Sequence, residues 1–382
     1  MCDLTIDIHN TDTTRDEWQK HNSMKMIGNV YIGDRIGSYA VSWRQDPFVR
    51  IYPTMARKAK SQALTLLLIV PLLSLAGVML YMSKCSPGPP PECPQVDNSR
   101  VSNEGIKSVK RDYSAFLVVL IMSGPQLDAR RYTIRETWMT KRTKDIIIKF
   151  VIGTHGLSGE EKKQLEKESG LHHDLLLLAS VHENLKSNTQ KLIDSFVWVD
   201  RHVDTKFVLK VDDDSIVRLD ALSRELRSKN QEKLYWGFFD GRQHAHTRGK
   251  YAENDWLLCD HYLPFAIGGG YVLSSDLIHY VAINAKMLKK YNAEDISLGS
   301  WLAAIDVDRE HDPRFDTEYK SRGCRNVYLI SHKQTAQDLK EKWSHMQKTG
   351  KMCEKEEQLR QSYVYNWNKP PSECCERVQG VP

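Results

Sequence analysis

Apolar and amphipathic segments alternate along the chain from about residue 112 onward. Four continuous apolar runs, rich in β-branched residues, predict strands buried on both faces, at residues 115–123, 146–153, 174–179 and 207–211. Helices are predicted between them, at 158–169, where Ser-Gly-Glu-Glu is a capping box, and at 189–203. Strands that alternate with helices predict an α/β fold with a mostly parallel sheet flanked by helices. Such sheets bind their ligands beyond the carboxyl ends of the strands.

A different apolar segment comes earlier in the chain. Residues 63–82 are twenty residues without a charge, which is the length that crosses a bilayer as a helix. Only Lys84 follows it closely, whereas five basic residues precede it, namely Arg44, Arg50, Arg57, Lys58 and Lys60. The positive-inside rule therefore predicts a single-pass type II signal anchor with a cytosolic N-terminus. A cleaved signal peptide is the alternative, which the length and depth of the segment disfavour.

The anchor divides the chain into four predicted parts. These are a cytosolic tail at 1–62, the anchor at 63–82, a Pro-rich stem at 83–111 and a lumenal catalytic domain at 112–382. The prolines between residues 86 and 94 favour a stiff, extended backbone. Met55 stands directly before the basic flank of the anchor, so we hypothesise that residues 1–54 are a gene-model extension or an isoform. Peptides from residues 1–54 in the purified protein would refute this.

Composition narrows the class of protein. Hydrophobic residues make up 41% of the chain and charged residues 27%, as in folded globular proteins, and the net charge of +5 is spread too evenly for nucleic-acid binding. Seven of the eight cysteines follow the anchor, which fits a disulfide-permissive lumen, and they lack zinc-site spacing. The late cysteines Cys353, Cys374 and Cys375 are predicted to staple the C-terminus, with their pairing left open.

Three consecutive aspartates, Asp212 to Asp214, leave the predicted strand at 207–211. Carboxylates this close repel one another unless a cation or strong donors neutralise them. Oxygen ligands suit Mg²⁺ or Mn²⁺, which would bridge to a diphosphate. A solvated acidic turn is the structural alternative, and the preceding strand, the following helix and the lumenal location favour the metal site.

A basic cluster at residues 130–138 follows the first predicted strand. Arg131 and Arg135 are four residues apart, so on a helix they share a face. At the carboxyl end of a strand they could bind phosphate or ribose oxygens of a nucleotide donor. The alternative is that Arg135 braces the fold by pairing with the acidic loop, and the sequence supports both equally.

Three further segments carry candidate residues. Gly268 to Gly270 would let a ligand approach the backbone or would form a tight turn, and their spacing fits neither a dinucleotide nor a P-loop fingerprint. Glu294 and Asp295 stand at a predicted helix start, where one could be a general base or both could simply cap the helix. His332 follows a predicted strand at 327–331, and its spacing alone does not make it a metal ligand.

In their order along the chain, these motifs resemble glycosyltransferase family 31, the β-1,3-glycosyltransferases. The matching pieces, from about residue 116 to Pro382, are RRYTIRETW, FVIGT, FVLKVDDDS, YWGFF, LPFAIGGGYVLS, AEDISLG and YLISHK. The resemblance implies a GT-A fold, UDP-galactose as donor, Mn²⁺ as cofactor and a Golgi membrane location. Segments 235–239, 258–264, 311–319 and 371–375 resemble the members that extend galactosyl-xylose on proteoglycan core proteins, for heparan and chondroitin sulfate. Complexes with other linker-region glycosyltransferases would fit that role.

The resemblance also implies roles for single residues. Asp214 matches a direct metal ligand, Asp212 a ligand of the metal or ribose, and His332 the family's late metal-side histidine. Asp295 matches the carboxylate regarded as the base, with Ile296 in place of the family's Val. Donor-binding roles fall on Arg131, Arg135, Asp212, Asp213, Gly269 and Gly270. An insertion near 186–188 interrupts the family's N-L-T-x-K stretch, which leaves a donor role for Lys191 open.

The expected mechanism is an inverting displacement. UDP-galactose is an α-glycoside, so a β product requires attack from the opposite face, with Asp295 deprotonating the acceptor hydroxyl. Two alternatives stay open: a β-1,3-N-acetylglucosaminyltransferase or a transferase with another acceptor, and a non-catalytic relative that binds glycans. The intact aspartate triplet, Asp295 and His332 count against the second. A metal-dependent hydrolase would need a second metal cluster or a nucleophile motif.

Overall fold

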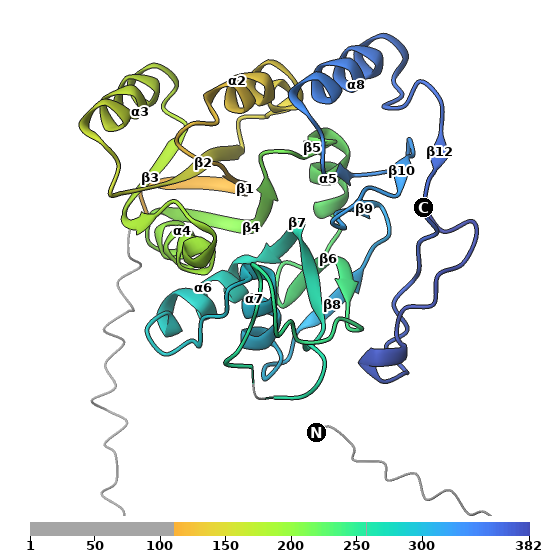
Figure 1. The fold of residues 1–382 in the computed structure, drawn as a ribbon. Coiled ribbons are helices and arrows are strands. Elements are labelled where there is room, and N and C mark those ends of the chain that lie inside the picture. The colour runs from red at the N-terminus through yellow and green to blue at the C-terminus, as the bar shows by residue number, and fades with distance from the viewer. Residues whose placement is uncertain (1–110, 257) are drawn as a thin grey trace, which may run out of the picture. The chain divides into compact units, whose positions relative to one another are not determined.

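The computed structural model describes residues 111–256 and 258–382 (Figure 1). The chain divides into two units, Met1–Ser108 and Val109–Pro382, and the described residues all belong to the second. The predicted tail, the anchor at 63–82 and nearly all of the stem lie outside the described residues. Within the described ranges, every helix is too short or too polar to cross a membrane.

A seven-stranded sheet forms the centre of the described domain, in the order β3-β2-β1-β4-β7-β6-β8. Its strands are β1 (Tyr113–Met122), β2 (Ile146–His155), β3 (Leu175–His182), β4 (Val203–Asp212), β6 (Leu234–Asp240), β7 (Phe265–Ser274) and β8 (Asp308–His311). The first four pair in parallel, and β6 pairs in parallel with β8. Strand β7 is antiparallel to both β4 and β6, so its beginning lies beside the end of β4.

Helices lie on both sides of this sheet, α2, α3 and α8 on one side and α4, α6 and α7 on the other (Figure 1). The helices are α2 (Asp128–Glu136), α3 (Gly159–His172), α4 (Asn188–His202), α5 (Leu219–Leu226), α6 (Ser275–Asn284), α7 (Glu294–Leu302) and α8 (Ala336–Thr349). Short 3₁₀ turns are η1 (Trp138–Lys141), η2 (Leu185–Ser187) and η3 (Pro371–Glu373). The domain is thus a mixed α/β fold with a central, mostly parallel sheet flanked by helices, as predicted.

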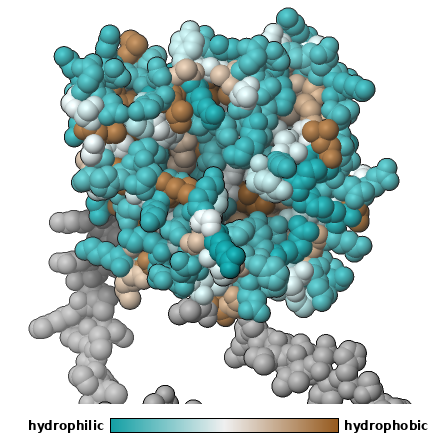
Figure 2. Space-filling model, in the orientation of Figure 1, coloured by the Kyte–Doolittle hydropathy of each residue, from teal (hydrophilic) through white to brown (hydrophobic). Residues whose placement is uncertain are grey.

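Local sequence signals explain these elements. The four predicted strands are present, and most of their side chains are buried between the helix layers. Helix α3 begins with the predicted capping box, in which Ser158 and Glu161 exchange side-chain to backbone hydrogen bonds. On the face that Figure 2 shows, the described surface is mostly hydrophilic, with apolar residues in small separate groups.

A small sheet places residues 330–332 next to the acidic loop. Its order is β5 (Ile216–Val217), β11 (Ile330–Ser331) and β9 (Phe315–Asp316). Because Ser331 pairs with Ile216, the aspartates just before β5 meet His332 just after β11.

One disulfide links distant segments of the C-terminal region, and it joins Cys353 to a cysteine outside the predicted late cluster. Cys324, in the two-residue strand β10 (Gly323–Cys324) that pairs with β12 (Glu357–Gln358), is bonded to Cys353. The adjacent residues Cys374 and Cys375 are bonded to each other.

Candidate active site

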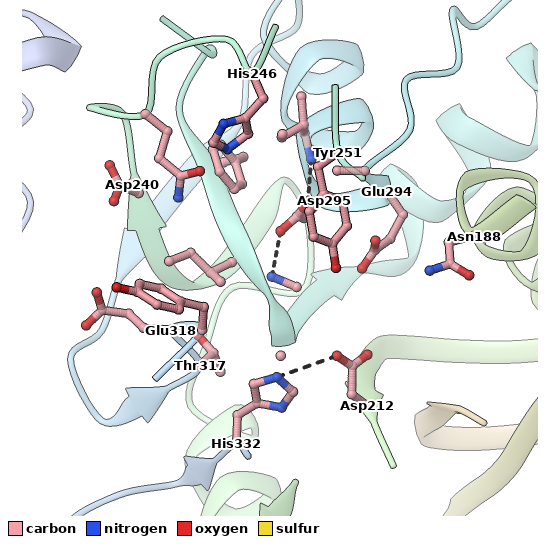
Figure 3. A pocket seen from close by; sticks show the side chains of 18 of the residues that line it. Asn188, Asp212, Asp240, His246, Tyr251, Glu294, Asp295, Thr317, Glu318 and His332 are labelled. Atoms are coloured by element: carbon pink, nitrogen blue, oxygen red, sulfur yellow. Dashed lines mark hydrogen bonds and ion pairs between the residues drawn. The ribbon is translucent and has the colours of Figure 1, made fainter. Parts of the chain in front are cut away.

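A cavity of about 1210 Å³ opens at the carboxyl end of β4, between the start of β7 and the start of α7. Its wall includes Asp212, Gly268, Gly269, Asp295 and His332, so residues from four distant segments of the sequence meet there. Figure 3 shows Asp212 and His332 facing each other, with Glu294 and Asp295 further along the same cavity. The position agrees with the rule that α/β sheets bind ligands beyond their strand ends.

Asp212, Asp214 and His332 form a candidate metal site, since one ligand atom from each lies within 4.8 Å of the others. His332 Nδ1 lies 2.8 Å from Asp214 Oδ1, and His332 Nε2 lies 3.8 Å from Asp212 Oδ2. Ser215 Oγ lies 3.0 Å from the same Nδ1 and helps to fix the ring. Two carboxylates and an imidazole suit a divalent ion such as Mn²⁺.

The electrostatics of Asp214 also fit a cation site. Its Oδ1 atom is buried and lies 2.8 Å from His332 Nδ1. Burial alone would raise the pKa of Asp214, but His332 and Lys333 outweigh that effect and lower the pKa to about 2. Asp214 is therefore a charged, largely buried carboxylate next to an imidazole, as a metal ligand should be.

The middle aspartate points elsewhere. Asp213 is buried, and its Oδ1 atom accepts a hydrogen bond of 3.1 Å from Arg130. Burial raises the pKa of Asp213, against the opposing effects of Ser123 and Arg130. The candidate metal site therefore takes the outer two aspartates and leaves out Asp213.

The glycine triplet lies inside strand β7, so it does not form the tight turn that was the alternative to a ligand-binding role. A Cβ atom on Gly268 would lie 2.7 Å from Glu294 Oε1, and one on Gly269 would lie 2.8 Å from His332 Cγ. Adjacent residues of a strand face opposite sides, so the two glycines make room for different side chains of the cavity. Gly270 packs instead against Ile330 and lies outside the cavity wall. The glycines thus serve close packing of the site's own side chains.

Asp295 begins helix α7 and is oriented by two backbone donors. Its Oδ2 atom accepts from the N–H of Gly268 and its Oδ1 atom from the N–H of Ile296, both at 2.9 Å. Burial and the neighbouring Glu294 carboxylate raise the pKa of Asp295 to about 7, against the opposing charge of Lys210. A half-buried carboxylate with this pKa is suited to accept a proton near neutral pH.

Arg131 and Arg135 lie on one face of α2, as predicted, but outside the cavity wall. Arg131 is fully buried and its guanidinium donates two hydrogen bonds to Glu168, at 2.8 and 2.6 Å. Arg135 donates to Glu168 and, with two hydrogen bonds of 2.8 Å, to Asp174. This placement corrects the donor-binding interpretation in favour of bracing, although the partners belong to α3 and the start of β3 and not to the acidic loop.

Lys191 is buried on α4 and borders the cavity. Its Nζ atom donates to Ser123 O at 2.5 Å and to Glu183 Oε1 at 2.7 Å. Burial lowers the pKa of Lys191, against the opposing effect of Glu183. Lys191 thus anchors the turn after β1, while its role toward a donor stays a prediction.

Sequence reasoning missed two features of the cavity. Lys210 Nζ donates to Asp212 Oδ1, Glu294 Oε1 and Gly268 O, at 2.8, 2.7 and 2.5 Å. The signal was available, because a lysine two residues before Asp212 in a buried strand shares its face. The second feature is a cationic part of the wall, contributed by Arg242, Arg248, Lys250, Arg360 and Arg377. These residues come from irregular segments, whose spacing carries no periodic signal.

Comparison with known proteins gives a consistent result. The family model described as "Galactosyltransferase" matches residues 129–313. Beta-1,3-galactosyltransferase 6 of Mus musculus is 45% identical over 312 residues, which cover 80% of this chain and 92% of the mouse protein. UDP-GalNAc:beta-1,3-N-acetylgalactosaminyltransferase 2 of Xenopus laevis is 31% identical over 196 residues, which cover 51% of this chain and 39% of that protein.

Solved structures resemble the domain only weakly. The galactosyltransferase LgtC in complex with donor and acceptor sugar analogs has 12% sequence identity and a TM-score of 0.30, over 56% of this chain and 86% of that chain. A likeness at this level supports no statement about the site.

Proposed function

The chain belongs to the galactosyltransferase family, and from this premise we propose that it transfers galactose from UDP-galactose to the galactosyl-xylose of a proteoglycan core protein, in β-1,3 linkage with inversion. The identity of 45% with beta-1,3-galactosyltransferase 6 of Mus musculus, over most of both chains, supports this choice within the family. We further propose that the catalytic domain has a GT-A fold. We propose that the whole chain is a type II membrane protein of the Golgi apparatus.

We propose Mn²⁺ as the cofactor, held by Asp212, Asp214 and His332. The donor set of two carboxylates and an imidazole supports it. When bound, a divalent ion would neutralise charge on the diphosphate of the donor as it departs. The aspartates themselves provide the negative potential that draws a cation to this end of the cavity.

Asp295 performs the proton transfer in this proposal. Its two backbone hydrogen bonds hold the carboxylate against the wall of the cavity, where the acceptor hydroxyl must approach. Deprotonation of that hydroxyl makes the oxygen a stronger nucleophile, and displacement from the face opposite UDP gives the β product. Carboxylates act in the same way on sugars in inverting glycoside hydrolases.

A single observation carries the proposal: Asp212, His332 and Asp295 border one cavity although they come from β4, the segment after β11 and α7, and the third candidate metal ligand, Asp214, lies 2.8 Å from His332. A non-catalytic glycan-binding relative would not require this convergence. A transferase with another donor or acceptor would require it equally, so substrate choice needs a direct assay.

The test is to incubate the purified full-length chain with Mn²⁺, one UDP-sugar at a time and a panel of acceptors that includes galactosyl-xylose. We expect a product only with UDP-galactose and galactosyl-xylose, with the mass of one added hexose and a β-1,3 linkage. A product from UDP-N-acetylglucosamine or on another acceptor would establish the alternative transferase. Absence of product with all pairs, from a chain that binds UDP, would contradict enzymatic function.

A further inference from the structure

Lys210 is buried at the centre of the candidate active site, on strand β4. Its side chain is 1% exposed, and its ammonium group donates to three oxygens from three elements: Asp212 of β4, Gly268 of β7 and Glu294 of α7. An ammonium group has three N–H donors, so all of its hydrogen bonds are used within the protein. Lys210 therefore has no donor left for a substrate, and any effect on the reaction must act through its partners.

The partners of Lys210 are themselves residues of the cavity wall. Burying an ammonium group costs free energy unless it is well paired, and an apolar side chain of similar length would often stabilise the fold equally well. A lysine kept for stability alone could be paired anywhere in the core. Here the ammonium group joins the candidate metal site to the helix start that carries the candidate base.

One of these connections reaches Asp295 through Gly268. The carbonyl oxygen of Gly268 accepts the hydrogen bond from Lys210, and the N–H of the same residue donates to Asp295 Oδ2 at 2.9 Å. Because both hydrogen bonds involve Gly268, Lys210 fixes the stretch of β7 that orients the Asp295 carboxylate. Asp295 has no direct ion pair with Lys210, so its own charge stays available for proton exchange.

The second connection separates the roles of two adjacent carboxylates. Glu294 and Asp295 are neighbours, and two like charges so close disfavour each other. Lys210 makes an ion pair of 2.7 Å with Glu294 and none with Asp295. Of the two carboxylates, Asp295 is therefore the one without a cationic partner, and burial and Glu294 raise its pKa.

We propose that Lys210 is a positioning residue for sugar transfer: it ties the metal-site carboxylate Asp212 to Glu294 and Gly268, and thereby sets Asp295 as the proton acceptor. This inference rests on the proposed function, because it concerns the same site.

The first experiment replaces the ammonium group with an apolar side chain of similar length, Lys210→Met. We expect kcat to fall about 30-fold or more, while the Kd of UDP measured by calorimetry with Mn²⁺ stays within about threefold. The control is Lys342→Met, which removes a half-buried lysine of α8 outside the cavity wall and should keep kcat. A Lys210→Met chain that keeps kcat, or that loses only UDP affinity, would overturn the proposal.

A second variant distinguishes positioning from simple loss of structure. Adding Glu294→Gln to Lys210→Met removes the carboxylate left without its cation, so kcat should recover about tenfold relative to Lys210→Met alone. An unpaired buried carboxylate also lowers stability, and its removal restores part of that loss, so denaturant titration of the same chains must show that kcat recovers beyond any change in the folded fraction. If the losses of kcat in the two single variants simply added, so that the double variant was slower than either, the proposed connection would be contradicted.

Glu294→Gln alone keeps the proposal testable if Lys210→Met does not fold. The acid limb of kcat/KM should shift to lower pH, because the carboxylate that raises the pKa of Asp295 is gone. The other titratable groups that face Asp295 are Tyr235, Tyr262 and Tyr271, whose pKa values burial raises, so they stay neutral in this range. An unchanged acid limb would overturn the proposal.

The result for Lys210 does not depend on whether the proposed substrates are correct. If the chain transfers a different sugar or uses another acceptor, the substrate assignment fails. The comparison of wild-type, Lys210→Met and Glu294→Gln chains then runs with the substrate pair that reacts, and its result still decides the role of Lys210.

Discussion

A Cβ atom on Gly269 would lie 2.8 Å from Cγ of His332, closer than side-chain carbons pack against each other. It would also lie 3.0 Å from the carbonyl oxygen of Thr317, which is backbone and cannot rotate away. The imidazole ring therefore occupies its place beside Asp212 and Asp214 only because residue 269 has no side chain.

Gly269→Ala should for this reason weaken metal-dependent UDP binding. The added methyl group displaces the His332 ring from the two carboxylates, and disturbing the support of a metal ligand typically costs 10–100-fold in affinity. We expect a loss of about tenfold in UDP affinity, measured by calorimetry with and without Mn²⁺.

Gly270→Ala is the matched control for this substitution. Its new carbon would meet Cδ1 of Ile330 at 2.9 Å, the mobile end of a side chain that does not touch the candidate metal site. This variant should lose some stability and keep its UDP affinity. Equal affinity losses in Gly269→Ala and Gly270→Ala would show that the effect is general to the strand.

Asp295→Asn should abolish most of the turnover while UDP binding survives. An amide cannot accept the acceptor proton, and removal of a general base typically costs 10²–10⁴ in rate. Asp295 contacts none of the candidate metal ligands, so the Kd of UDP with Mn²⁺ should stay within about twofold. A variant with wild-type kcat would refute the assignment of the base.

The same carboxylate predicts the pH dependence of the wild-type chain. With a pKa of about 7, Asp295 is protonated in acid and cannot act as a base, so kcat/KM should fall as the pH drops below about 7. Steady-state rates between pH 5.5 and 8.5 would measure this limb; the Asp295→Asn chain should lack it. A flat profile in the wild-type chain would contradict the role of Asp295.

Asp295 should also reduce stability as the pH rises. Burial and Glu294 raise its pKa from 3.8 to about 7, so between these values the folded chain holds a proton that the unfolded chain has released. The unfolded state binds fewer protons there, and the free energy of unfolding therefore falls with rising pH through this window. Thermal unfolding without ligands at pH 5 and pH 7.5 should show a smaller decline in Asp295→Asn than in the wild-type chain.

Much of the fold follows from the order of apolar runs. The strands at 115–123, 146–153, 174–179 and 207–211 are long, continuous and separated by amphipathic helices, so their parallel pairing is strongly determined. Strand β7 was harder to predict, because three consecutive glycines lack the side chains that signal a strand. Its antiparallel pairing with β4 is a long-range contact that no local pattern encodes.

The candidate site shows the same division between local and long-range information. Asp212, Asp214 and Asp295 stand at element ends, which places them at the edge of the sheet from sequence alone. His332 joins them through the pairing of Ser331 with Ile216, which spacing cannot reveal, and only the family resemblance singled it out. Arg131 illustrates the opposite error, because its carboxylate partner, Glu168, lies 37 residues away and cannot be identified from spacing along the chain.

The arginines of α2 provide a final test that separates bracing from donor binding. Arg131 is fully buried and its ion pair with Glu168 is 2.6 Å long, so Arg131→Met leaves that carboxylate with Arg135 as its cation. Breaking one side of a buried ion pair costs about 3–5 kcal/mol, and because Arg135 remains we expect the free energy of unfolding to fall by about 3 kcal/mol. The double variant Arg131→Met with Glu168→Met removes both charges and should recover part of the loss.

In the folded fraction of either variant the Kd of UDP should equal that of the wild-type chain, since Arg131 lies outside the cavity wall. Denaturant titration and calorimetry measure the two quantities separately, and a selective loss of UDP affinity with unchanged stability would restore the donor-binding role.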